Sequence, residues 1–171
     1  MSELALPRTL QEHPEADGLA HELSVRSEPL WRDAVNSAAR VELSPRVAQV
    51  LGSAHSAGRI VRGLEAAEKV LAAEDRGLRH ADGRTSVERG GRVSRLVLLA
   101  DDGAERFYRN VDKLVRVYEP RVLALRTRAD KAELGAQLYG PGQVARLLLL
   151  THKDAVTSLL LALAADWTEG A

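Results

Sequence analysis

The chain has 171 residues, 28% of them charged and 45% hydrophobic, with equal numbers of acidic and basic side chains and no cysteine. This composition is typical of a folded globular protein with an aliphatic core. The absence of cysteine excludes disulfides, thiolate metal sites and thiol nucleophiles. The six aromatic residues are too few to predict a platform for stacking single-stranded bases.

The charges are unevenly distributed, because residues 1–48 are acidic by three charges and residues 49–171 are basic by three. The first residues lack a basic flank followed by an apolar run, so they do not resemble a secretory signal. The longest apolar stretch near the end, Leu159–Ala165, is far shorter than the roughly 20 residues that span a membrane. We therefore expect a cytoplasmic protein without membrane contact.

The first 43 residues predict an acidic N-terminal extension with one short helix. Residues 1–27 mix prolines, glycine and acidic residues without a sustained period. The stretch EPLWRDAVNSAARV (28–41) places apolar residues at helical spacing, which predicts a short amphipathic helix. We expect Trp31 to anchor that helix on the rest of the chain.

A second region begins at Ser44-Pro45, a pair that favours a helix start with serine as the N-cap. This helix should end at Gly58 and be followed by a short edge strand, Arg59–Arg62. Gly63 then predicts the start of a helix that runs from Leu64 to about Arg76. The stretch 77–92 has four glycines and no period, so we expect a long polar loop that carries several arginines.

The remainder alternates apolar strands and helices. The strands are predicted at Ser94–Ala100, Arg121–Arg126 and Val144–Leu150, and the helices at Asp102–Val117, Asp130–Tyr139 and from a Thr151-x-x-Asp154 cap to about Ala165. Strands without polar alternation are covered on both faces. The sequence therefore predicts an α/β fold over residues 44–165, a three-layer α/β/α sandwich with a four-stranded mixed sheet, followed by a tail at 166–171.

Three stretches resemble one family in order and spacing. They are LGSAHSAGRIVRGLEAAEKVL, RLVLLADDGAERFYRNVDKLVRVYEPRV and RADKAELGAQLYGPGQVARLLLLTHKDAVTSLL, and together they cover about Pro45–Leu160. The chain is similar to the bacterial YlxQ-type branch of the kink-turn RNA-binding superfamily of ribosomal proteins L-seven-Ae and L-thirty-e. The resemblance implies a non-enzymatic protein that binds structured RNA, such as rRNA, in connection with the ribosome or translation, and does not bind DNA.

The resemblance also implies two RNA-binding segments. The first is the turn into a helix, where a glycine and a helix N-terminus favour phosphate; it comprises Arg59, Arg62, Gly63, Glu65 and Lys69. The family motif here is Gly-x-Asn-Glu-x-x-Lys, and this chain keeps only Gly63 and Lys69. The second segment is a helix start and its following loop, which close over an unstacked nucleotide in the family; it comprises Arg128, Lys131, Gly142, Val144 and Ala145.

Simpler interpretations of the same residues stay open. Glu65 and Lys69 have the spacing of an ordinary helical ion pair. Asp101 and Asp102 follow a buried strand, where carboxylates hold Mg²⁺ in many hydrolases, although Asp102 is also well placed to cap the next helix. Gly135 in mid-helix is unfavourable and predicts a close approach by another segment.

Three alternative functions therefore remain. The first is a protein-interaction module on the same fold that has lost RNA binding. The second is a metal-dependent hydrolase that uses Asp101 and Asp102, and the third is a recognition domain of the kind fused to knotted RNA methyltransferases. No histidine spacing indicates a metal site, and no glycine-rich phosphate loop indicates a nucleotide. We expect no cofactor and no metal.

Overall fold

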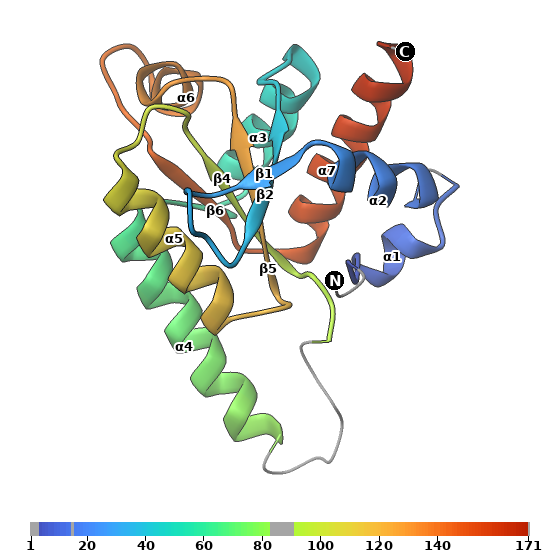
Figure 1. Cartoon of the computed structure of the whole chain (residues 1–171), viewed down its shortest axis with the longest axis vertical. Helices are drawn as coiled ribbons and strands as arrows, with labels where there is room; N and C mark the ends of the chain where they lie inside the picture. The colour runs from blue at the N-terminus through green and yellow to red at the C-terminus, as the bar shows by residue number, and fades with distance from the viewer. Residues whose placement is uncertain (1–3, 15, 83–90, 171) are drawn as a thin grey trace.

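The computed structural model describes residues 4–14, 16–82 and 91–170 of the chain. Its elements are drawn in Figure 1. Within these residues the helices are α1 (Arg8–Gln11), α2 (Ala16–Val25), α3 (Pro45–Ser56), α4 (Leu64–Asp82), α5 (Glu105–Val117), α6 (Lys131–Tyr139) and α7 (Lys153–Glu169). The strands are β1 (Ser27–Pro29), β2 (Ser37–Val41), β3 (Ile60–Arg62), β4 (Arg95–Leu99), β5 (Val122–Thr127) and β6 (Leu147–Leu150).

The strands form one mixed sheet in the order β1-β2-β5-β4-β6-β3. Strand β5 pairs in parallel with both β4 and β2, whereas β6 pairs antiparallel with β4 and β3, and β1 antiparallel with β2. The predicted α/β class is confirmed, as is the edge position of β3. The predicted number of four strands is wrong, because β1 and β2 extend the sheet beyond β5.

Helices cover both faces of this sheet, because its central strands are apolar on both sides. All side chains of Leu96–Leu99 and Leu147–Leu150 are fully buried. Leu96, Leu98, Leu148 and Leu150 pack in one core with α1, α2, α3, α6 and α7. Val97, Leu99, Leu147 and Leu149 pack in a second core with α4 and α5. Among the described residues, no helix combines the length and apolar character needed to cross a membrane.

The helix predicted for residues 28–41 is wrong, because this stretch forms β1, a turn and β2. The buried carboxylate of Asp112, on α5, fixes the turn. It accepts hydrogen bonds from the indole Nε1 of Trp31 (3.1 Å), the backbone of Val35 (3.0 Å) and the backbone and side chain of Asn36 (both 2.9 Å). Trp31 therefore anchors a strand connection rather than a helix. These contacts come from a distant part of the chain and override the local helical spacing.

The N-terminal helices pack against α7, on the face opposite α4 and α5. Leu10, Leu19 and Leu23 are buried in the same core as the inner side of α7. The guanidinium of Arg26 lies 4.5 Å from the ring centre of Trp167. Helices α1 and α2 therefore cover α7, and strands β1 and β2 lengthen the sheet beyond β5, at the margin opposite β3.

Several predicted boundaries need correction. Helix α4 continues to Asp82, so the first residues of the predicted 77–92 loop are helical, while residues 83–90 lie outside the described part. Helix α5 begins at Glu105 after Ala104, so Asp102 is not its N-cap. Helix α7 is capped by His152, so the predicted Thr151 cap is wrong, and residues 166–169 of the predicted tail are helical.

Two predicted caps are confirmed. The side-chain oxygen of Ser44 accepts a hydrogen bond from the backbone of Val47 at 3.1 Å. The carboxylate of Asp130 accepts one from the backbone of Glu133 at 2.8 Å. Each satisfies an N–H group that would otherwise lack a partner at the helix start.

Gly135 explains how α6 holds the loop that follows it. A Cβ atom built at this position would lie 2.3 Å from the backbone oxygen of Gln143 and 2.5 Å from the Cα of Val144. Only glycine permits this distance, since the opposing atoms belong to backbone and cannot rotate away. The predicted close approach at Gly135 is therefore made by the loop 140–144.

We expect Asp112→Ala to lower the free energy of unfolding by about 3 kcal/mol, because it leaves several buried donors of the β1–β2 turn without an acceptor. Urea denaturation followed by circular dichroism measures this change. Asp33→Ala removes an exposed carboxylate from the same turn and should change stability by less than about 0.5 kcal/mol. Equal effects of the two substitutions would contradict the assigned role of Asp112.

The same carboxylate should make stability depend on pH. Burial alone would raise the pKa of Asp112, but the hydrogen bonds from Val35, Asn36 and Trp31 outweigh it and hold the pKa below the usual carboxyl value. A depressed folded pKa stabilises the protein fully above the unfolded pKa of about 4, and the stabilisation is lost as pH falls through the folded value. Unfolding free energies measured between pH 3 and 6 should therefore decline more steeply below pH 4 in the wild type than in Asp112→Asn.

Gly135→Ala should destabilise the protein by roughly 1–3 kcal/mol, because the added methyl group forces the loop 140–144 away from α6. Gly52→Ala, in the interior of α3, is the matched control, since nothing lies within 4 Å of a Cβ there. The control should stabilise by up to about 1 kcal/mol through helix propensity. Denaturation midpoints that move in the same direction for both variants would refute the packing argument.

Candidate nucleic-acid interface

Most of the predicted site residues lie on the side of the sheet where the ends of several strands meet. The carboxyl ends of β2, β3, β4 and β5 and the start of β6 meet there, as shown by the pairs Val41↔Thr127, Leu99↔Arg126, Leu99↔Leu147 and Arg62↔Leu148. We call this region the loop edge and define it as residues 62–65, 100–104, 128–131 and 140–146. Loops at such an edge are the usual position of binding residues in α/β proteins.

The two segments implied by the resemblance lie side by side at the loop edge. The backbone of Gly63 donates a hydrogen bond to the oxygen of Leu147 at 2.9 Å, which joins the start of α4 to the end of the loop 140–146. Gly63, Gly140 and Gly142 all have positive φ angles, between 82° and 97°, where side chains with a Cβ are strained. No atom lies within 4 Å of a Cβ built at any of these three glycines, so the backbone there is open.

Arg62 connects the two segments. Its guanidinium lies 4.0 Å from the centre of the Tyr139 ring, and its Nη1 donates to the side-chain oxygen of Gln143 at 3.3 Å. Burial raises the pKa of the Tyr139 hydroxyl, and the positive charge of Arg62 partly offsets that rise. Arg62 itself stays exposed. The residue therefore holds the loop against the edge strand while it presents a charge to the surface.

Val144 and Ala145 differ in accessibility. Val144 is 42% exposed at the tip of the loop, whereas Ala145 is 1% exposed and belongs to the core. The backbone of Ala145 donates to the oxygen of Lys131 at 2.9 Å, which ties the loop to the start of α6. A base at the loop edge can therefore contact Val144, and the expected contact with the Ala145 side chain is not available in this arrangement.

Carboxylates neutralise several cations of the second segment. Arg128 pairs with Glu42 at 2.7 Å, and the Nζ atom of Lys131 lies 3.7 Å from Asp102. Both pairs are well exposed, and such pairs are weak because water and salt screen them. An anion that approaches Arg128 or Lys131 therefore competes with a carboxylate that contributes little binding energy of its own.

Asp101 and Asp102 are both engaged by basic groups. Asp101 lies 2.8 Å from Arg40 and 2.9 Å from Arg126. Asp102 accepts a hydrogen bond from the backbone of Lys131 at 2.9 Å, so it supports the start of α6 rather than α5. Within residues 4–14, 16–82 and 91–170, no group of three or more histidine or acidic side chains is placed to hold a metal ion.

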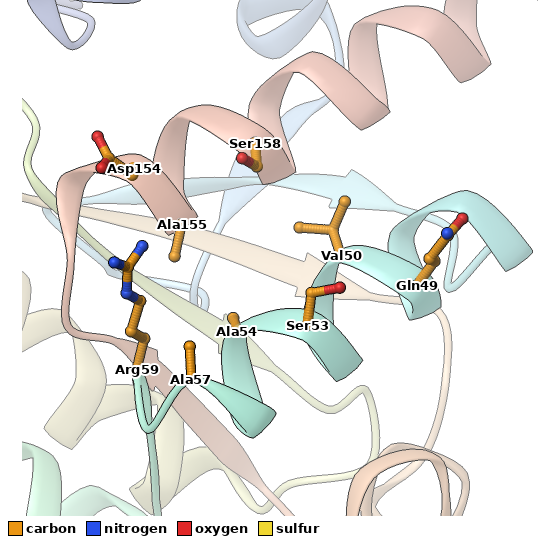
Figure 2. A pocket seen from close by; sticks show the side chains of 9 residues that line it. All are labelled: Gln49, Val50, Ser53, Ala54, Ala57, Arg59, Asp154, Ala155 and Ser158. Carbon is orange, nitrogen blue, oxygen red and sulfur yellow. The ribbon is translucent and has the colours of Figure 1, made fainter.

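Arg59 does not join the loop edge, although the resemblance implies that it belongs to the same RNA-binding segment as Gly63. It precedes β3, and its backbone oxygen accepts a hydrogen bond from Thr151, which follows β6. Arg59 therefore lies at the other end of the strands, away from the loop edge. Its side chain lines a hollow of about 300 Å³ between α3 and α7. Figure 2 shows it reaching toward Ala155 and Asp154 at the start of α7.

Glu65 and Lys69 are exposed on the first turns of α4, near Gly63. The structure records no ion pair between them, so within the described part of the chain the expected helical pair is not formed. Lys69 is therefore available to an anion beside the loop edge, and Glu65 places one negative charge in the same area.

The sequence analysis missed a row of cations on the outer face of α5. Arg106, Arg109, Lys113 and Arg116 recur at intervals of three or four residues, and all four are exposed. This spacing is visible in the sequence and predicts one helical face.

No family model matches the chain, and no curated protein matches it. Among solved structures, the chain is similar to a protein of unknown function from Bacillus halodurans C at 17% identity. That similarity covers 71% of this chain and 99% of the other, with a TM-score of 0.45.

Proposed function

We propose that the chain binds structured, kink-turn-like RNA at the loop edge and acts as a binding protein rather than an enzyme. The observation that carries the proposal is the hydrogen bond between Gly63 and Leu147. It brings together two segments, far apart in the sequence, that were each assigned to RNA from the resemblance. The proposal includes the ribosome- or translation-associated role that the resemblance implies.

The chemistry of the loop edge supports this function. The open glycine backbone at residues 63, 140 and 142 allows a phosphate group to approach closely. Arg62 and Lys69 supply positive charge at the same place. Val144 is an exposed apolar side chain, and proteins that bind structured RNA contact unstacked bases with such groups.

The state of the carboxylates favours binding over catalysis. Asp101 is held between two guanidinium groups and Asp102 supports a helix start, so both have structural partners. A carboxylate that activates water or holds a cation needs free lone pairs facing the substrate. The proposed function therefore uses the edge as a surface and assigns no reaction to it.

A protein-interaction module on the same fold is the second candidate. The observation in its favour is the pairing of Arg128 with Glu42 and of Lys131 with Asp102, which reduces the net charge of the surface. Salt dependence separates the two candidates, since phosphate contacts release counterions and lose affinity steeply with salt.

Val144→Asp should weaken binding to a fluorescein-labelled kink-turn RNA by about tenfold, because it removes an apolar contact with an unstacked base and adds a negative charge. Fluorescence anisotropy measures the affinity at several salt concentrations. Val25→Asp is the control, since Val25 is also exposed but lies at the end of α2. The control should leave affinity unchanged.

An RNA duplex of the same composition without the kink completes the design. The wild type should prefer the kinked RNA, and Val144→Asp should lose most of that preference. Equal affinity for both RNAs, or binding that does not respond to salt, would overturn the proposed function in favour of the interaction module.

A further inference from the structure

Helix α5 presents a row of four cations to solvent. Its inner face buries Tyr108, Val111, Leu114 and Val115 against the sheet. Its outer face carries four exposed cations, which are Arg106, Arg109, Lys113 and Arg116. At 1.5 Å per residue the row is about 15 Å long, and its members lie along one side of a straight helix.

The acidic residues of α5 do not cancel this row. Asp112 points inward, where the β1–β2 turn satisfies its carboxylate. Glu105 pairs with Arg109 at 3.3 Å, but both side chains are about half exposed, so water screens the pair. Within the described residues, Arg106, Lys113 and Arg116 form no ion pair. The outer face therefore keeps an excess of three positive charges.

The β1–β2 turn forms a wall beside the row. Trp31 lies under the guanidinium of Arg109, whose carbon is 4.6 Å from the ring centre. A hollow of about 640 Å³ lies between the turn and α5, and it is lined mainly by polar and charged side chains. Asp33 is the acidic residue of the turn in this hollow, and it lies 3.8 Å from Arg32. Hydrogen bonds to Asp112 hold this turn against α5 itself.

We infer that the outer face of α5 is a second contact surface for RNA, which binds the phosphate backbone of a stem. A row of exposed cations at regular helical spacing can face the regular row of phosphates in a stem, and three of the four are arginines, whose planar forks suit phosphate oxygens. A protein partner would need an apolar centre in its interface. Among the described residues, the large exposed apolar side chains near the row are Val35 on the β1–β2 turn and Val117 at the end of α5, and neither lies within the row itself.

The position of α5 relates this surface to the loop edge. The chain enters α5 directly after residues 100–104, which belong to the loop edge, and α5 lies beside α4 on the same side of the sheet in Figure 1. An RNA bound near Gly63 would meet the cationic row if its stem continued across the side of the sheet that α4 and α5 cover. The inference in this form rests on the proposed function, although the stem contact does not depend on a kink.

The test compares Arg106→Gln/Lys113→Gln with the wild type in fluorescence anisotropy, with the kink-turn RNA and the unkinked duplex as probes. Both substituted residues lack ion pairs in the described part of the chain, so the variant should fold normally. Affinity for both RNAs should fall several-fold. The slope of log affinity against log salt should decrease by about two, one for each lost phosphate contact.

Arg8→Gln/Lys153→Gln is the matched control, because it removes the same charge from exposed positions on α1 and α7, on the opposite side of the sheet. The control should leave the slope unchanged. An equal loss in both variants would overturn the inference, since it would reflect net charge alone. A poly-glutamate peptide serves as a third probe. If Arg106→Gln/Lys113→Gln lost binding to this peptide but kept its affinity for RNA, the inference would also be overturned, and the row would be assigned to an acidic protein partner.

The outcomes separate this inference from the proposed function. If Arg106→Gln/Lys113→Gln lowers the salt slope but the wild type binds kinked and unkinked RNA equally, the result supports the α5 surface and overturns kink recognition at the loop edge. If the wild type prefers the kinked RNA but Arg106→Gln/Lys113→Gln leaves the salt slope unchanged, the result supports binding at the loop edge and overturns the α5 surface. Failure of the wild type to bind either RNA overturns both.

Discussion

The architecture depends on two neighbouring strands that bury apolar side chains on both faces. Leu96–Leu99 and Leu147–Leu150 have no exposed surface, and their side chains alternate between two separate cores. Such strands are stable only when helices cover both sides of the sheet. The antiparallel pairing of β4 with β6 then brings the end of one strand beside the start of the other, and that pairing creates the loop edge.

Much of this arrangement is predictable from the sequence because its signals are local. Continuous leucine runs indicate buried strands, and Ser44-Pro45 and Asp130 mark helix starts through contacts within three residues. The stretch 28–41 shows the limit of this reasoning. Its apolar spacing favours a helix, but its donors bind a carboxylate some eighty residues away in the sequence, and β2 pairs with β5. The local sequence pattern contains no signal for either contact.

The candidate site was predictable in part for the same reason. Gly63 comes directly before α4, as predicted, and its hydrogen bond to Leu147 places it beside the loop that contains Gly142. The positions of the cations were not predictable with equal accuracy. Arg59 and Arg62 are only three residues apart, yet an extended strand of about 10 Å separates them and places them at opposite ends of the strands. The acidic partners of Arg128 and Lys131 come from other loops, so only the tertiary structure reveals them.

The two outer strands restrict how the sheet can interact with other chains. β1 and β3 have three residues each; all three residues of β1 are exposed, and the strand ends at Pro29, which has no backbone N–H to donate. Very short outer strands are poor templates for strand addition, and the proline in β1 weakens that template further, so both features protect a sheet against edge-to-edge aggregation. Extension of the sheet by a strand from a second chain is therefore disfavoured at both of its outer strands.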